Sequence, residues 1–357
     1  GKPAEALPLF EASLASAKAR KDRLSEAMTE SAIGRTLVAT GNFDDARKHL
    51  KKAVRVARSL RAPQVRFEAV THLAAMELDA DDPDAALEYA HQGVEILESL
   101  LEGLAEEEGA LARQKGADIF DAGAIAALKL EDPAEAAHFL ESGRAGALLA
   151  LLGRRERLRW RAESLPAELR KADAEAAENQ RIAQSALERA TRRRDRERQK
   201  AAEVKLDEAN AAAQSVAARI QRTMQGQDDL FYPRARPIEE IADGVGPGEA
   251  LVLYGLVGRH AMALVIESGE QRLVHLGTRR DIEEACLALD MSSPDGDVGA
   301  ALETARQRLA KPLALGKDIK RVLISPDGVT CYVPFATLFD QTVAMTPSGT
   351  THLMLMD

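Results

Sequence analysis

Apolar and small residues recur along the first 150 positions in a pattern that repeats itself. Four segments align, at 1–6, 41–46, 81–86 and 131–136, with spacings of 40, 40 and 50 residues. Each begins with a turn-forming residue, continues with a helix-start residue or proline, and then carries acidic residues and alanine. Acidic side chains near a helix start satisfy its free amide groups and its dipole. Each segment is therefore predicted to open a helix.

The clearest unit puts small residues where two antiparallel helices must approach, at Gly34, Ala46 and Ala53, with the apolar Leu50 between them. This arrangement resembles the tetratricopeptide repeat (TPR). The later units carry corresponding residues at Ala74, Ala86, Gly93, Ala124, Ala136, Leu140 and Gly143. We therefore predict a mainly α chain that starts with a TPR-like α-solenoid over 1–152, in preference to an irregular helical bundle.

The solenoid prediction has two consequences. Residues 1–19 should be the second helix of a repeat whose first helix precedes them, because the aligned signature opens second helices. Stacked repeats leave a concave surface that commonly binds a peptide or protein segment. A protein or peptide partner is therefore expected there.

Residues 165–224 contain few turn-forming residues and two runs of apolar or small residues at helical spacing. The basic run RRRDRERQK at 192–200 interrupts them. We predict a coiled-coil helical hairpin over 153–226 that bends near this run; one continuous helix is the alternative. The run lacks aromatic residues and contains Asp195 and Glu197, so no nucleic-acid binding is expected.

A different pattern follows residue 227, where prolines and glycines precede apolar runs that alternate with helical ones. Strands are predicted at 250–256, 261–267 and 271–276, and helices at about 278–290 and 298–314. A buried strand from Val322 leads through Pro326-Asp327-Gly328 into another short strand. Strands alternating with helices indicate an α/β domain, which we place at 227–357.

Charge and composition limit the classes of partner, cellular location and cofactor that can be expected for this protein. The net charge of −9 disfavours nucleic acid and anionic membranes as partners of the whole chain. Cys286 and Cys331 form neither a disulfide framework nor a zinc pattern, and no apolar run approaches the length of a membrane helix. A cytoplasmic location is expected. No cofactor or metal is expected, because the sequence contains no nucleotide-binding loop motif and no metal-ligand motif.

The residues after 320 carry a family resemblance. SPDG at 325–328, followed by the Pro334-Phe335 pair, is similar to the CHAT domain, a caspase-like domain found with TPR repeats in bacterial proteins. LVLYGLVGRHAMALVI at 251–266 and TPSGTTHL at 346–353 support it. The resemblance implies a TPR–CHAT cysteine protease that cleaves peptide bonds with a Cys–His pair, acts in bacterial defence or signalling, and is represented here by its first parts.

The sequence departs from that family at the catalytic motifs. Neither its His-Gly motif nor its Ser-Ala-Cys motif occurs, since His352 precedes Leu353 and Cys331 comes before the nucleophile's place. No catalytic residue is therefore assigned, and Cys331 is predicted to be a buried, inert thiol on a strand. The remaining histidines are expected to be surface or packing residues. The alternative is a non-catalytic TPR adaptor with a degenerate CHAT module.

Overall fold

The computed structural model describes residues 3–101, 116–153, 166–192, 236–289 and 297–346, together with 197–198, 200–202, 204–206, 208–209, 212 and 215–216. It confirms a mainly helical chain with a smaller α/β part. Two compact units result. One comprises 1–96, 116–144 and 234–357, and the other comprises 97–115 and 145–233. None of the described helices is long and apolar enough to cross a membrane.

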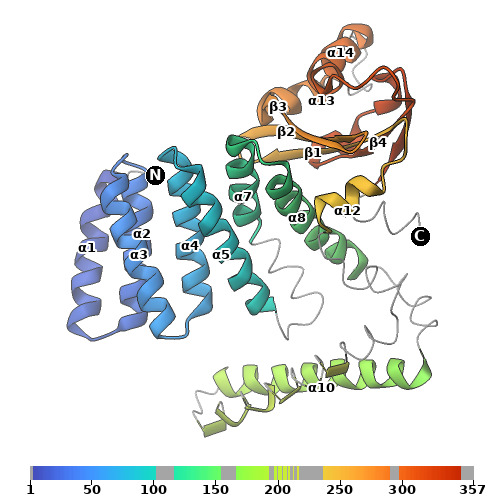
Figure 1. Cartoon of the computed structure of the whole chain (residues 1–357). Helices are drawn as coiled ribbons and strands as arrows, with labels where there is room; N and C mark the ends of the chain where they lie inside the picture. Colours follow the sequence, from blue (N-terminus) through green and yellow to red (C-terminus); the bar gives the residue numbers. More distant parts are fainter. Residues whose placement is uncertain are drawn as a thin grey trace. The chain divides into compact units, whose positions relative to one another are not determined.

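Consecutive helices of the repeat region run in alternating directions and pack in sequence order (Figure 1). Their bounds are α1 Pro3–Ala19, α2 Arg23–Val38, α3 Phe43–Ser59, α4 Pro63–Asp79, α5 Pro83–Leu101, α7 Ala117–Leu130 and α8 Pro133–Gly153. The second helices of three repeats begin at 43, 83 and 133, at the predicted boundaries near 41, 81 and 131. The predicted repeat signature therefore marks real helix starts.

The connectors between these helices share one geometry. In each, a residue with positive φ follows the helix, and the next amide bonds back to a carbonyl five residues earlier, as in the Schellman motif. The positive-φ residues are Lys21, Gly41, Arg61, Asp81 and Glu131. The first four are 20 residues apart, so helix and connector together form a repeating unit.

Small residues allow the paired helices to approach, as predicted. A Cβ atom added to Gly34 would lie 2.5 Å from Leu50 Cγ, and Ala46 is fully buried in the same contact. An added Cβ on Gly93 would lie 2.4 Å from Ile119. Because these distances are well inside van der Waals contact, any larger side chain would push the helices apart.

Helix α10, Ala167–Arg192, belongs to the second compact unit. It lies where the first helix of the hairpin is predicted, and the described residues between 197 and 216 are helical as well. The predicted bend falls on residues 193–196, which lie outside the described residues.

The α/β part contains a five-stranded sheet in the order β3-β2-β1-β4-β5. Its strands are β1 Glu249–Val257, β2 His260–Glu267, β3 Glu270–Thr278, β4 Arg321–Ser325 and β5 Thr342–Met345. Strands β1, β2 and β3 pair antiparallel, whereas β4 runs parallel to both β1 and β5. The first four strands are predicted by the sequence, and β5 is not.

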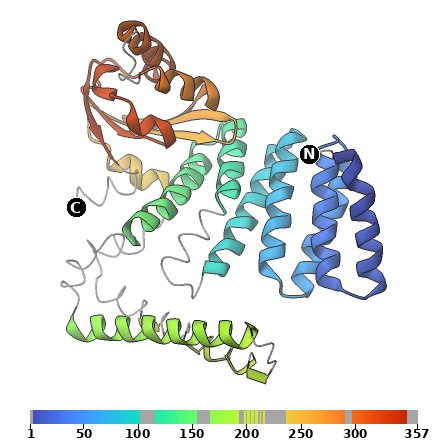
Figure 2. The ribbon, with the colours of Figure 1, turned by 180° about the vertical axis from the view of Figure 1, so that it is seen from behind.

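Helices α13 Arg279–Leu287 and α14 Val298–Ala305 lie on one side of this sheet, and α12 Ile238–Asp243 lies on the other (Figure 1, Figure 2). Helix α14 is continued by π and 3-10 turns to Leu313. Tyr254 of β1 stacks on Phe335, and its hydroxyl donates to the Leu309 carbonyl at 2.8 Å. Phe335 thus enters the core, as the Pro-Phe pair predicts.

The other face of β1 lies against the last helix pair of the repeats. A Cβ added to Gly255 would lie 2.7 Å from Leu140 Cδ2 of α8, and one added to Gly258 would lie 3.1 Å from Ile125 of α7. Two glycines therefore let the repeats reach the sheet backbone. Through this contact residues 116–144 and the sheet belong to one compact unit.

Candidate protein-binding surface

The first helices of the repeats, α2, α4 and α7, present equivalent positions along one side. Positions 24, 28 and 35 of α2 correspond to 64, 68 and 75 of α4, and 68 corresponds to 118 of α7, by the 40- and 50-residue spacings. Leu24 and Met28 are exposed to 46% and 53% despite being apolar. We name this surface the first-helix face and define it by Leu24, Met28, Arg35, Glu68, His72, Ala75 and Asp118.

His72 of α4 lies in the middle of the first-helix face and contacts α2. Its Nδ1 lies 3.2 Å from the Ser31 hydroxyl of α2. Burial lowers the pKa of His72, the positive charge of Arg35 lowers it further, and the charge of Asp118 opposes both effects. The charges of Arg35 on α2 and Asp118 on α7 thus both act on His72 of α4.

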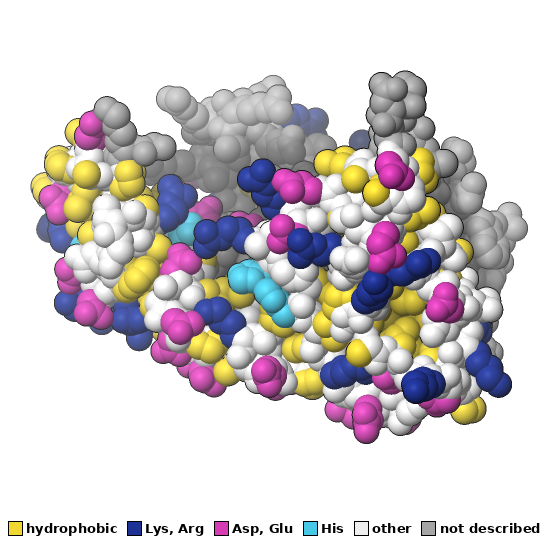
Figure 3. All heavy atoms as spheres, turned by 90° about the horizontal axis from the view of Figure 1, so that it is seen from above, with side chains coloured by type: hydrophobic (Ala, Val, Ile, Leu, Met, Phe, Trp, Pro, Cys, Tyr) yellow, Lys and Arg dark blue, Asp and Glu magenta, His cyan; other side chains and the backbone are white. Residues whose placement is uncertain are grey.

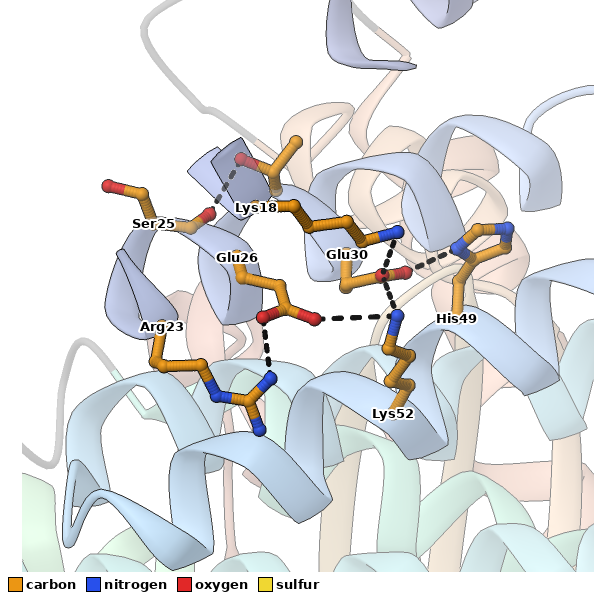
Figure 4. A network of polar contacts seen from close by, with 8 residues as sticks. Lys18, Arg23, Ser25, Glu26, Glu30, His49 and Lys52 are labelled. Atoms are coloured by element: carbon orange, nitrogen blue, oxygen red, sulfur yellow. Dashed lines mark hydrogen bonds and ion pairs between the residues drawn. The ribbon is translucent and has the colours of Figure 1, made fainter. Parts of the chain in front are cut away.

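Beneath this face, buried carboxylates bind the helices to one another. Figure 4 shows Glu30 of α2 contacting Lys52 Nζ at 2.6 Å and His49 Nδ1 at 2.5 Å, both from α3. Lys18 Nζ of α1 lies 4.0 Å away. Burial pushes the pKa of Glu30 upward, but the hydrogen bonds from Lys52 and His49 outweigh it, so its pKa lies below the ordinary value. Three helices therefore meet at one ionised group.

Further ion pairs extend the same support. Glu26, one helical turn before Glu30, forms ion pairs with Arg23 at 2.7 Å and with Lys52 at 3.5 Å. Arg47 of α3 binds the buried Glu77 of α4 through two nitrogens, at 2.7 and 2.6 Å. A guanidinium held in this two-point manner fixes orientation as well as distance. The first-helix face thus rests on helices whose relative placement is fixed by charge pairs.

The carboxyl ends of the parallel neighbours β1 and β4 form a second polar cluster. Asp327, just after β4, accepts a hydrogen bond from the Leu256 amide at 2.7 Å, and Arg279 donates to the Leu256 carbonyl at 3.3 Å. Asp121 of α7 accepts from the Gly258 amide at 2.9 Å. Burial and the nearby charge of Asp327 raise the pKa of Asp121. Such strand ends are the usual ligand sites of α/β sheets.

The structure corrects the prediction for Cys331. Residues Gly328–Tyr332 form a 3-10 turn instead of a strand, and Cys331 is exposed. Asp327 and Thr330 explain the difference, because each side chain bonds the other's backbone and thereby closes a turn. Gly328 has φ +53°, as the Pro-Asp-Gly reversal predicts. The expected burial of Cys331 is wrong.

This exposure gives a testable difference between the two cysteines. Cys286 is half-buried, and burial raises its pKa to about 11. Cys331 should therefore react with iodoacetamide in the folded protein at least about tenfold faster than Cys286, because the thiolate is the reacting form. Peptide mass spectrometry over a time course measures both rates. Equal rates in the folded protein would contradict the exposed turn, and urea-unfolded protein supplies the reference in which both react.

Most histidines hold packing positions. His49 and His72 have the contacts given above, His91 Nε2 contacts Glu135 at 2.8 Å, and His138 packs against Phe139. The His260 and His275 rings lie 5.9 Å apart on neighbouring strands. His352 lies outside the described residues. Among the described residues, no group of three or more His, Cys, Asp or Glu side chains is placed to hold a metal ion.

Residues 1–59 match the tetratricopeptide repeat family. The matched segment covers α1, α2 and α3, which includes the Glu30 network and the apolar end of the first-helix face. Repeats of this class act as protein-interaction surfaces, so a protein-binding role of the repeats agrees with the geometry. A search of curated proteins found no match to the chain.

Sequence reasoning alone assigns no residue to a binding surface. The 40-residue repeat spacing could have identified such residues. When it is applied to the first helices, it aligns Leu24 and Met28 with positions 64 and 68. The buried Glu30 gives no such signal, since a glutamate inside a helix is most often on the surface. Its partners become evident only when three helices are brought together.

Proposed function

We propose that this chain is the protein-binding and regulatory portion of a TPR–CHAT cysteine protease. The solenoid would recognise a partner through the first-helix face, and the α/β part would belong to a caspase-like domain that cleaves peptide bonds. A bacterial defence role, a cytoplasmic location and the three-domain division at 1–152, 153–226 and 227–357 are parts of the same proposal. The observation that supports partner binding most directly is the continuous first-helix face across three repeats.

The chemistry of this face fits a peptide with both apolar and acidic side chains. Leu24 and Met28 offer exposed apolar surface, and methionine adapts to differently shaped partners. Arg35 is exposed and can pair with a carboxylate, while His72 and Asp118 add hydrogen-bonding groups one helix farther along. An extended segment lying across α2, α4 and α7 would contact all of these groups in turn.

The caspase-like assignment is supported by the Pro-Asp-Gly turn and its surroundings. Gly328 takes the positive φ that the motif requires, Phe335 enters the core, and Asp327 holds the end of β1 through the Leu256 amide. A His-Gly and a Ser-Ala-Cys motif in the coding sequence after Asp357 would favour the protease. Their absence from the complete protein would favour the non-catalytic adaptor.

A peptide-display library selected on the immobilised chain tests the binding surface. We expect selected peptides to combine apolar and acidic residues, and Met28→Glu to weaken their measured Kd by about tenfold or more, as truncation of an interface anchor does. Leu9→Glu is the matched control, because Leu9 is an equally apolar residue of α1 that is 73% exposed on a second helix. Binding that survives Met28→Glu, or that both changes weaken equally, would rule out the first-helix face.

A further inference from the structure

A segment of the repeats is strongly basic in a protein that is acidic overall. Residues 46–67 contain eight lysine and arginine residues and no aspartate or glutamate, whereas the whole chain carries a net charge of −9. The segment runs from the first turn of α3 through the connector into α4. By contrast, Figure 3 shows acidic and basic side chains mixed over the face that it draws. The local excess of positive charge therefore needs its own explanation.

The basic residues of this segment fall into two groups. Arg47, Lys48 and Lys52 form ion pairs with carboxylates of the repeats. The others form no ion pair with any described residue. We name this second group the basic stripe, and it consists of Lys51, Arg55, Arg58, Arg61 and Arg66.

The basic stripe is continuous along the solvent side of α3. Lys51, Arg55 and Arg58 follow a spacing of four and three residues, which puts them on one helix face, and all three are exposed. The buried face of α3 is the opposite one, with Leu50 and Ala53 fully buried. From Lys51 to Arg58 the helix rises by about 10 Å. Arg61, also exposed, continues the stripe into the connector.

Arg66 of α4 completes the stripe and is incompletely satisfied. Its Nε is buried and has no hydrogen-bond partner, and it is the one such side-chain nitrogen or oxygen among the described residues. Burial lowers the pKa of Arg66, and the positive charge of Arg58 lowers it further, against a weaker opposing effect of Glu95. Two guanidinium groups that repel each other, one of them short of an acceptor, destabilise the protein unless an anion joins them.

We propose that the basic stripe is a second interaction surface, separate from the first-helix face, that binds an acidic segment of a partner protein. Carboxylates of the partner would pair with the exposed Arg55, Arg58 and Arg61, and their negative charge would offset the repulsion between Arg58 and Arg66. Arginine suits this task because its planar group binds carboxylates at two points. The surface thus adds electrostatic selection to the binding expected of the repeats.

Two observations favour an acidic protein segment over a nucleic acid. The basic segment 46–67 contains one Phe, Tyr or Trp residue, Phe67, which is half-buried, so the segment offers little ring surface on which bases could stack. The exposed apolar side chain beside it is Leu60, 39% exposed, which can contact an apolar residue of a peptide. The chain's overall negative charge also opposes a long polyanion more than a short acidic segment.

Fluorescence anisotropy with a labelled peptide of four Glu-Leu-Ala-Glu repeats tests the proposal on the full chain at about 150 mM NaCl. We expect binding, and we expect the triple substitution Arg55→Gln, Arg58→Gln and Arg61→Gln to weaken the Kd by about tenfold or more. The same peptide with glutamine in place of glutamate should not bind. The midpoint temperature of thermal unfolding should not be lower in the triple variant, because the substitutions remove repulsion between neighbouring arginine side chains.

The matched control removes the same charge elsewhere, through Arg259→Gln, Lys317→Gln and Lys320→Gln, which are exposed residues of the α/β part. It should leave the Kd within about twofold of the unchanged chain. Equal weakening by both triple variants would show unspecific attraction and overturn the proposal. Failure of the glutamate peptide to bind would do the same, and tighter binding of a labelled single-stranded oligonucleotide would assign the stripe to nucleic acid.

Discussion

Lys52→Met is expected to lower the free energy of unfolding by about 2–3 kcal/mol at pH 7, because it leaves the buried carboxylate of Glu30 without the ammonium group that contacts it at 2.6 Å. The Glu30 side chain is 1% exposed, so water cannot replace Lys52, whereas His49 remains in place and limits the loss. Urea unfolding followed by circular dichroism at 222 nm measures the change.

The double variant Lys52→Met with Glu30→Gln separates the charge effect from lost packing. Its stability should be within about 1 kcal/mol of the unchanged chain, because both partners of the pair are then neutral. A double variant as unstable as Lys52→Met alone would contradict the buried-charge explanation.

The pH dependence follows from the direction of the Glu30 shift. Because the pKa of Glu30 is lower in the folded chain than in the unfolded one, its contribution is complete above the unfolded value near 4.3 and is lost as pH falls through the folded value. Lys52, whose pKa is raised by its bond to Glu30, stays charged throughout this range. The loss in free energy of unfolding caused by Lys52→Met should therefore be smaller at acidic pH. A loss that does not change with pH would contradict the role of the ionised Glu30.

Gly123→Ala should destabilise the chain by about 2–4 kcal/mol through overpacking, although alanine is the better helix former. An added Cβ would lie 2.3 Å from the ring of Phe139, between α7 and α8. Gly143→Ala is the matched control in the same helix pair, where the added Cβ would meet Phe120 at 3.7 Å, an ordinary contact. We expect that change to be neutral or to stabilise by up to about 1 kcal/mol.

Thermal unfolding measures both glycine variants under the same conditions. Phe139→Leu should recover part of the loss in Gly123→Ala, because it removes the ring that the methyl group strikes. A loss of thermal stability in Gly123→Ala together with a gain in Gly143→Ala would support the close approach of α7 and α8. A gain in both variants would contradict it.

The parts of the fold that the sequence predicts are those set by local chemistry. The second-helix starts, the strands from 249 to 278 and the reversal at Gly328 follow from turn residues and apolar periodicity near each position. The segment after Gly328 is apolar enough to predict a strand. The mutual bonds of Asp327 and Thr330 decide for a turn instead, and a pattern of apolar residues does not contain that information.

Features made by distant segments are the ones that sequence reasoning missed. Among the described strands β5 pairs with β4 alone, and its four residues carry too short a pattern to stand out. Glu30 and its cations come from three helices, and Arg58 and Arg66 from two. The charged residues of the last two cases look like ordinary surface residues until the repeats stack.

The uniform connectors of the repeats have an evolutionary consequence. Since Lys21, Gly41, Arg61 and Asp81 recur every 20 residues with the same turn, a duplication or deletion of 40 residues would join one such turn to another. The stack would keep its geometry, because a solenoid repeat is held mainly by its neighbouring repeats. Copy number can therefore change by unequal recombination without any new turn having to be selected, and the length of the binding surface can change with it.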